Sequence, residues 1–195
     1  DIKKVDLALK VIFLSQKCKT FKDCSKLIFS KKKVNFYNLK NKVVVFQCTS
    51  SYPCKDIEAN LNVINSYRKR YNLEVGFSDH TLGTELALVS IGLGCNYIEK
   101  HFTLNKKMKG PDHATSLDLK ELKYLSNAVE KTSKALGSSK KKITPSEIIN
   151  KKAVRKTYYF RKEIRKNSII KIEDLIFKRP FSKENSRKIF NSVGK

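Results

Sequence analysis

Apolar and polar residues alternate in blocks that divide the middle of the chain into strand-length and helix-length segments. The run VVVFQC (43–48) is continuous and rich in β-branched residues, which predicts a strand buried on both faces. Shorter apolar runs at 74–78 and 96–101 predict two further strands. Helical spacing of apolar residues predicts a helix after each strand: residues 56–71, 85–93 and 118–136. Strands that alternate with helices through short links predict an α/β fold with a parallel sheet and right-handed crossovers.

The N-terminal segment has a different pattern. Residues 1–14 place their apolar side chains on one face at helical spacing, which predicts a helix. Residues 15–42 are rich in lysine and show no clear period beyond a short apolar patch at 27–29, so we interpret them as a connector.

The C-terminal third changes in composition. Residues 137–147 (GSSKKKITPSE) indicate a linker, in which TPSE resembles a helix cap but is more often a simple turn. Beyond it, residues 153–160 alternate as a strand, and two short apolar runs follow with a helical turn at 172–175 between them. We therefore expect a small β-rich module after the α/β part.

The charge is large but unevenly distributed. The 195 residues include 42 Lys and Arg against 18 Asp and Glu, a net charge of +24. Residues 1–42 carry 12 basic and 3 acidic residues and residues 151–195 carry 15 and 4, whereas residues 43–142 carry 15 and 10. A basic nucleic-acid-binding protein is therefore one hypothesis. Because the excess lies at both ends within Lys-, Asn- and Ile-rich sequence, we favour compositional drift and expect no nucleic-acid partner.

The remaining composition excludes several classes. Apolar residues at 40% are enough for a packed core, and no run approaches the ~20 apolar residues of a membrane span. We expect no membrane partner. Five cysteines at irregular spacing do not suggest a disulfide framework, so a reduced, cytoplasmic setting is expected.

The three histidines are the strongest chemical signal. His80 and His101 come at the ends of successive predicted strands, and His113 lies in the loop after the second. Neighbouring parallel strands end at one edge of a sheet, so these side chains can converge there. Two neutral imidazoles suit a divalent transition metal that keeps positions open for substrate and water, although each could instead be an ordinary hydrogen-bonded loop histidine.

Acidic residues accompany the histidines. Asp79 precedes His80, and Asp112 precedes His113. Strand alternation places Glu99 on the same face as His101, where its carboxylate could orient a substrate hydroxyl or act as a base. The alternative for Glu99 is a salt bridge with Lys100 or with a lysine of an adjacent strand.

Five motifs occur in order along the chain: QCTSSYP (47–53), VGFSDHTLG (75–83), IEKHFTL (98–104), GPDHATSL (110–117) and FKRP (177–180). Together they resemble the sialic acid synthase family, which condenses phosphoenolpyruvate with an N-acetylated amino sugar. The resemblance implies the C-terminal part of a (βα)8 TIM barrel at 1–137, a linker at 138–150 and a partial β-rich antifreeze-like (SAF) domain at 151–195.

The resemblance also implies catalytic roles. His80 and His101 would hold the catalytic metal, commonly manganese, with magnesium and cobalt as alternatives. Glu99 and Asp112 would bind or activate the sugar. His113 is left unassigned, because relatives vary at this position.

Substrate contacts are implied by motif position. Tyr52 and Ser78 would contact phosphoenolpyruvate, with Asp79 in the same substrate-binding set and Ser50 at a place often occupied by Asn. Arg179 would reach the sugar from the antifreeze-like domain of a second subunit, which implies a domain-swapped homodimer.

The family's early barrel strands, its phosphate-gripping lysines and the last lobe of its antifreeze-like domain have no counterpart here. We therefore expect an incomplete form that is inactive in isolation, or a non-catalytic sugar-binding remnant. The amino sugar stays open among the neuraminic, legionaminic, pseudaminic and 9-phosphate branches.

Overall fold

The computed structural model describes residues 1–30, 34–110 and 112–195. Residues 31–33 of the expected connector and Pro111 of the GPDH motif lie outside the described residues. The chain divides into two compact units, Asp1–Gly137 and Ser138–Lys195, which we describe separately.

Within the described part of the first unit, three parallel strands form one sheet in the order β1-β2-β3. They are β1 (Val44–Cys48), β2 (Glu74–Asp79) and β3 (Tyr97–Lys100). Cys48 pairs with Ser78, and Ser78 pairs with Glu99, so the strands end nearly level with one another. The three strands, their positions and their parallel pairing confirm the sequence-based prediction.

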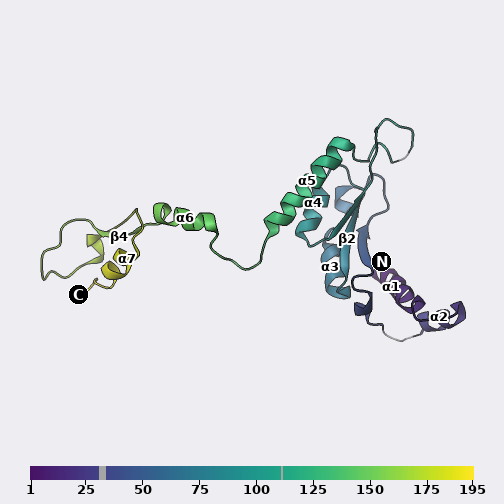
Figure 1. Cartoon of the computed structure of the whole chain (residues 1–195), viewed down its shortest axis with the longest axis horizontal. Coiled ribbons are helices and arrows are strands. Elements are labelled where there is room, and N and C mark those ends of the chain that lie inside the picture. The colour runs from purple at the N-terminus through teal and green to yellow at the C-terminus, as the bar shows by residue number, and fades with distance from the viewer. Residues whose placement is uncertain (31–33, 111) are drawn as a thin grey trace. The chain divides into compact units, whose positions relative to one another are not determined.

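Three helices pack on one face of this sheet: α3 (Asn62–Tyr71), α4 (Glu85–Gly92) and α5 (Leu119–Leu136) (Figure 1). Val75 and Phe77 of β2 face this layer and pack with Ile64 of α3. Ile98 of β3 packs with Leu125 of α5. Because side chains alternate along a strand, Ser78 and Glu99 belong to the opposite face.

The sequence predicted one continuous helix over residues 56–71, but the structure breaks this segment into two parts. A short 3₁₀ turn, η2 (Asp56–Glu58), is followed by Asn60 with φ of 47°, and only then does α3 begin. Left-handed backbone interrupts a right-handed helix, and asparagine is one of the few residues that adopt it readily. The Asn60 side chain donates to the carbonyl of Glu58 and holds this break (3.0 Å).

The N-terminal segment contains more helix than its pattern indicated. Helix α1 (Ile2–Ser15) agrees with the prediction. The expected connector holds a second helix, α2 (Phe21–Ile28), and a 3₁₀ turn, η1 (Phe36–Leu39). The Thr20 hydroxyl caps α2 by accepting from the Asp23 amide (3.2 Å). Eight residues give too few repeats of the helical period to be recognised.

The second unit mixes helices with a two-stranded antiparallel sheet of β4 (Thr157–Phe160) and β5 (Leu175–Lys178). The unit also contains three helical segments: α6 (Pro145–Val154), the 3₁₀ turn η3 (Ile172–Asp174) and α7 (Lys183–Phe190). The turn η3 agrees with the expected helical turn, whereas α7 was not predicted.

Helix α6 corrects two expectations. It occupies part of the expected linker, 138–150, and it includes residues 153 and 154, which were assigned to a strand. Thr144 and Glu147 form a capping box, in which each side chain accepts from the other's backbone amide. TPSE is therefore a true helix cap, not only a turn.

Two further observations concern membrane spans and disulfide bonds. Across the described residues, no helix is both long and apolar enough to cross a membrane. All five cysteines are free thiols.

Candidate active site

His80 and His101 lie side by side where β2 and β3 end. Their ring centroids are 5.1 Å apart and the rings are nearly perpendicular, at 82°. Tyr52, from the loop after β1, lies against both rings, with centroid distances of 4.3 Å to His80 and 5.6 Å to His101. Three consecutive strand ends thus contribute to one cluster, which is the convergence that the sequence predicted for this histidine pair.

The ring of His80 is oriented by the backbone of the neighbouring strand end. Its Nδ1 lies 2.9 Å from the carbonyl oxygen of Thr49. A carbonyl can only accept, so Nδ1 carries a proton, and in the neutral ring Nε2 is the nitrogen left to coordinate. The backbone carbonyl of His80 in turn accepts from the Cys54 amide (2.8 Å). Both ring and backbone are therefore held in place, with Nε2 as the free coordinating atom.

The ring of His101 faces a carboxylate beyond hydrogen-bond distance, and its backbone is hydrogen-bonded. Its Nδ1 faces Asp112, with 3.7 Å between Nδ1 and the carboxylate Oδ2. Its backbone carbonyl accepts from the Leu117 amide (2.9 Å). Asp112 therefore lies behind the imidazole, and the carboxylate is about half exposed (46%).

Glu99 completes the cluster. The Ser78 hydroxyl donates to Glu99 Oε1 at 2.6 Å, across the paired positions of β2 and β3. The alternative of a Glu99–Lys100 salt bridge is wrong, because the Lys100 ammonium binds Asp79 instead (2.8 Å). Glu99 is solvent-exposed, so its second oxygen is available to a ligand.

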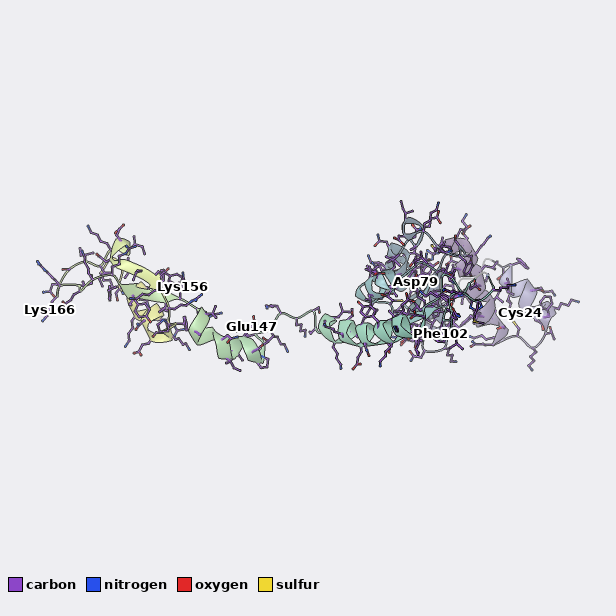
Figure 2. The ribbon with its side chains drawn as sticks, turned by 90° about the horizontal axis from the view of Figure 1, so that it is seen from above. Cys24, Asp79, Phe102, Glu147, Lys156 and Lys166 are labelled. Carbon is purple, nitrogen blue, oxygen red and sulfur yellow. The ribbon has the colours of Figure 1, made fainter. Side chains whose placement is uncertain are left out.

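Asp79 does not join the cluster, which corrects its assignment to the substrate-binding set. Its side chain belongs to the helix-covered face of β2, is fully buried and lies among packed side chains of the first unit (Figure 2). One carboxylate oxygen accepts from the amide and hydroxyl of Thr81, and the other accepts from Lys100. A carboxylate that is buried and fully hydrogen-bonded has no free oxygen to offer a substrate.

The remaining predicted residues lie in different places. Ser50 is exposed in the loop that carries Tyr52. His113 makes a 2.7 Å hydrogen bond with the Thr103 hydroxyl in the loop after β3. Arg179 belongs to the second unit, where its Nε donates to the carbonyl of Val154 (2.9 Å).

Two residues at the site were missed by the sequence reasoning. Thr49 orients His80 through a backbone carbonyl, which no side-chain pattern reveals. Cys48 ends the run that predicts a strand buried on both faces, but it is exposed, with its sulfur 3.9 Å from His80 Nδ1. Its strand parity was the available signal, because Cys48 pairs with Ser78 and shares its face.

The donor set fits a divalent metal bound at an open site. No group of three or more His, Cys, Asp and Glu able to hold a metal occurs within 1–30, 34–110 and 112–195. The chain therefore offers two imidazoles and no closed cage. Imidazole nitrogens suit transition metals, and a site with two protein ligands leaves positions for substrate and water.

A parallel α/β sheet with paired histidines and a carboxylate at its strand ends defines the class: an α/β protein with a polar site at the carboxyl edge of its strands. The family follows from comparison. Residues 2–141 match the model of the NeuB family, and the chain belongs to that family.

Curated relatives carry related names. The chain is 39% identical over 153 residues to an N,N'-diacetyllegionaminic acid synthase of Campylobacter jejuni, which covers 78% of this chain and 46% of the relative. It is 34% identical over 154 residues to the human N-acetylneuraminate-9-phosphate synthase, covering 76% and 42%. The chain thus spans less than half the length of these relatives.

A solved structure supports the fold. The N-acetylneuraminic acid synthetase of Leptospira borgpetersenii, in complex with citrate, matches with a TM-score of 0.52 and 32% identity. The match covers 67% of this chain and 44% of that chain. The α/β fold with a parallel sheet is therefore similar to that of a sialic acid synthetase.

Proposed function

We propose that this chain carries the metal and sugar site of a nonulosonate synthase. The reaction condenses phosphoenolpyruvate with the aldehyde of an N-acetylated amino sugar. Carbon 3 of phosphoenolpyruvate forms the new C–C bond, water adds at carbon 2, and phosphate leaves with cleavage of its C–O bond. The observation that carries the proposal is the pair of oriented imidazoles, His80 and His101, in a member of a family whose curated relatives are named as such synthases.

Each residue of the cluster has a role that its contacts support. His80 and His101 would hold the divalent metal, with manganese first and magnesium or cobalt as alternatives. When bound, that metal polarises the sugar aldehyde as a Lewis acid. Asp112 supports His101 from its Nδ1 side. Glu99 accepts from Ser78 and has an exposed oxygen for a sugar hydroxyl.

Phosphoenolpyruvate would lie over Tyr52, with Ser50 and Ser78 nearby as hydrogen-bonding groups. Tyr52 is half exposed (48%) and covers both imidazoles, so it can orient a planar anion beside the metal. This assignment follows the family motif, and the polar, open strand ends are compatible with it.

The larger assembly is part of the same proposal. The three βα units would belong to a TIM barrel, and the second unit would correspond to part of an antifreeze-like domain. In a domain-swapped homodimer, Arg179 would approach the sugar of the partner subunit. Because the chain spans less than half of its relatives, turnover would need the remaining barrel strands.

Metal binding tests the site directly. We expect the chain to bind Mn²⁺, measured by electron paramagnetic resonance, and expect His80→Ala and His101→Ala each to weaken binding at least about 100-fold, since each removes one of two protein ligands. His113→Ala is the matched control, because this histidine is engaged by Thr103, and it should bind as the parent does. Equal affinity in all four proteins would contradict the assignment.

Activity tests the reaction. The chain should release phosphate from phosphoenolpyruvate and N-acetylmannosamine only when the N-terminal half of a NeuB-family synthase is supplied. His80→Ala should abolish that release. If the complemented chain binds Mn²⁺ but forms no nonulosonate with any of the candidate amino sugars, the non-catalytic sugar-binding alternative is favoured.

A further inference from the structure

A buried ion pair joins β2 and β3 on the face of the sheet opposite the histidine cluster, which consists of Tyr52, His80, Glu99 and His101. The Lys100 ammonium lies 2.8 Å from Asp79 Oδ2, and the side chains are only 4% and 0% exposed. Asp79 and Lys100 are register partners at the last paired position of these strands. The pair therefore sits at the point where the two strands end.

Each member of the pair directly precedes a histidine. Asp79 is followed by His80, and Lys100 is followed by His101. Side chains alternate along a strand, so the two histidine side chains lie on the opposite face of the sheet from the ion pair. The sheet backbone therefore separates the ion pair from both imidazole rings. Any effect of the pair on the positions of the two histidines would therefore act through the backbone.

Thr81 extends the connection across His80. Its amide and hydroxyl donate to Asp79 Oδ1 at 2.9 and 2.6 Å, and its carbonyl accepts from Lys100 Nζ at 2.7 Å. The residues on both sides of His80 are thus tied to one ammonium on β3. Thr81 is also fully buried, at 1% exposure. We call Asp79, Thr81 and Lys100 the strand-end clamp.

Stability alone does not account for this arrangement. Buried ion pairs are costly to desolvate, and apolar residues of similar size often serve as well. Lys100 moreover lines a pocket whose other lining residues include the apolar Ile91, Leu122 and Leu125, so an apolar replacement would have apolar neighbours. The clamp differs from apolar packing in one respect. It forms directional hydrogen bonds that link the two strand ends that carry His80 and His101.

We infer that the strand-end clamp positions His80 and His101 relative to each other for joint coordination of the divalent metal. Asp79, Thr81 and Lys100 are positioning residues, because they act through the backbone and touch neither metal nor substrate. The inference rests on the proposed function, since it requires the two histidines to share one metal.

The test compares Mn²⁺ affinity and bound-state spectra in the full chain. Lys100→Met should weaken Mn²⁺ binding about 10- to 100-fold, the range found when groups behind metal ligands are removed. Pulsed electron paramagnetic resonance should detect two coordinated imidazole nitrogens in the parent and fewer in the variant. Lys100→Arg keeps a cation for Asp79 and should retain affinity within about threefold.

The direction of the change in Mn²⁺ affinity distinguishes a positioning role of Lys100 from a purely electrostatic one. Lys100→Met leaves the Asp79 carboxylate unpaired near the metal, and an added negative charge would by itself tighten cation binding. Positioning predicts the opposite, a weaker site. Tighter or unchanged binding in Lys100→Met would overturn the inference.

A double variant guards against simple unfolding. Asp79→Leu with Lys100→Met removes both charges, so no buried charge is left unpaired. It should recover part of the thermal stability lost in Lys100→Met, because the Thr81 amide and hydroxyl still lose their acceptor, while its Mn²⁺ affinity stays low. Parent-like affinity in this double variant would also overturn the inference.

Two controls complete the experiment. Lys106→Met removes the half-exposed ion pair with Glu121 (2.6 Å) at the start of α5, and it should leave Mn²⁺ binding unchanged. His80→Ala and His101→Ala report on the proposed function itself. If they bind Mn²⁺ as the parent does, the metal assignment fails; if they lose binding while the clamp variants keep it, only the clamp inference fails.

Discussion

Asp6, Arg70 and Tyr71 show how single side chains connect distant parts of the first unit. Asp6 of α1 accepts hydrogen bonds from Arg70 Nε and from the Tyr71 hydroxyl of α3, each at 2.9 Å. The Arg70 hydrogen bond lowers the pKa of Asp6 below its usual value. Burial, followed by the hydrogen bond to Asp6, raises the pKa of Tyr71 to about 12. One carboxylate therefore stays charged while the adjacent phenol stays neutral.

Because the pKa of Tyr71 is raised on folding, we expect the first unit to lose stability in alkali. Its pKa is raised from 10.0 to about 12 on folding, so its contribution is complete below pH 10 and is lost as pH rises from 10 to 12. Tyr71→Phe should remove that loss, and the parent's unfolding free energy should fall by roughly 2 kcal/mol more than the variant's over this interval. Urea unfolding at a series of pH values measures both curves.

The control for this prediction is Tyr124→Phe. Tyr124 is 60% exposed, so its substitution should leave the alkaline loss as in the parent. Parallel curves for the parent and Tyr71→Phe between pH 10 and 12 would contradict the prediction.

At the scale of elements, close packing between β1 and β2 depends on a glycine. Gly76 of β2 pairs with Phe46 of β1, and a Cβ at position 76 would lie only 2.3 Å from Phe46 Cε1. The Phe46 ring therefore occupies the space that a side chain on β2 would need. This overlap lies on the same face as Ser78, three residues before the end of β2.

Gly76→Ala should destabilise the first unit by roughly 1–3 kcal/mol, because the Phe46 ring must move to admit the methyl group. Phe46→Leu in the same chain should recover part of the loss. Gly92→Ala is the matched control, since nothing lies within 4 Å of a Cβ there and alanine favours helix. Equal midpoints of chemical unfolding for Gly76→Ala and Gly92→Ala would refute the steric explanation.

At the scale of the whole molecule, the chain consists of two compact units, Asp1–Gly137 and Ser138–Lys195. Residues 138–143 are exposed, lie outside helices and strands, and join α5 to α6 (Figure 1). The segment contains Lys140, Lys141 and Lys142. An exposed segment without regular structure is where a protease reaches the backbone first.

Brief treatment with trypsin should therefore cut first at Lys140–Lys142 and release two pieces near the boundary of the units. Lys131 and Lys134 are the internal controls, because they are accessible but lie within helix α5 and should be cut more slowly. Mass spectrometry of the first fragments gives the order. Cleavage within α5 before cleavage at Lys140–Lys142 would contradict the division of the chain into two compact units at this segment.

The charge also belongs to this scale. The two basic ends lie in different units, residues 1–42 in the first and 151–195 in the second. The near-balanced stretch 43–142 contains β1, β2, β3 and the histidine cluster. Most of the net charge of +24 therefore lies outside the stretch that holds the histidine cluster, which itself carries +5, and the absence of a nucleic-acid partner stays a prediction.

The sequence by itself determined the three parallel strands, the helices α1, α4 and α5, and the convergence of His80 and His101. These features depend on local periodicity and on the rule that parallel strands end at one edge, both of which can be recognised in the order of residues. The break at Asn60, helix α2 and the start of α6 were missed, because single residues and short helices leave too little periodic signal.

Only the tertiary structure decided which neighbours each charged side chain would take. Strand alternation put Glu99 on the face of His101, but only the structure shows that the opposite face is covered and that Asp79 is buried there against Lys100. A strand's alternation separates the two faces, but which face is covered by helices depends on packing between segments far apart in the chain. For the same reason, the backbone carbonyl that orients His80 and the clamp behind both histidines became visible only once β1, β2 and β3 were placed side by side.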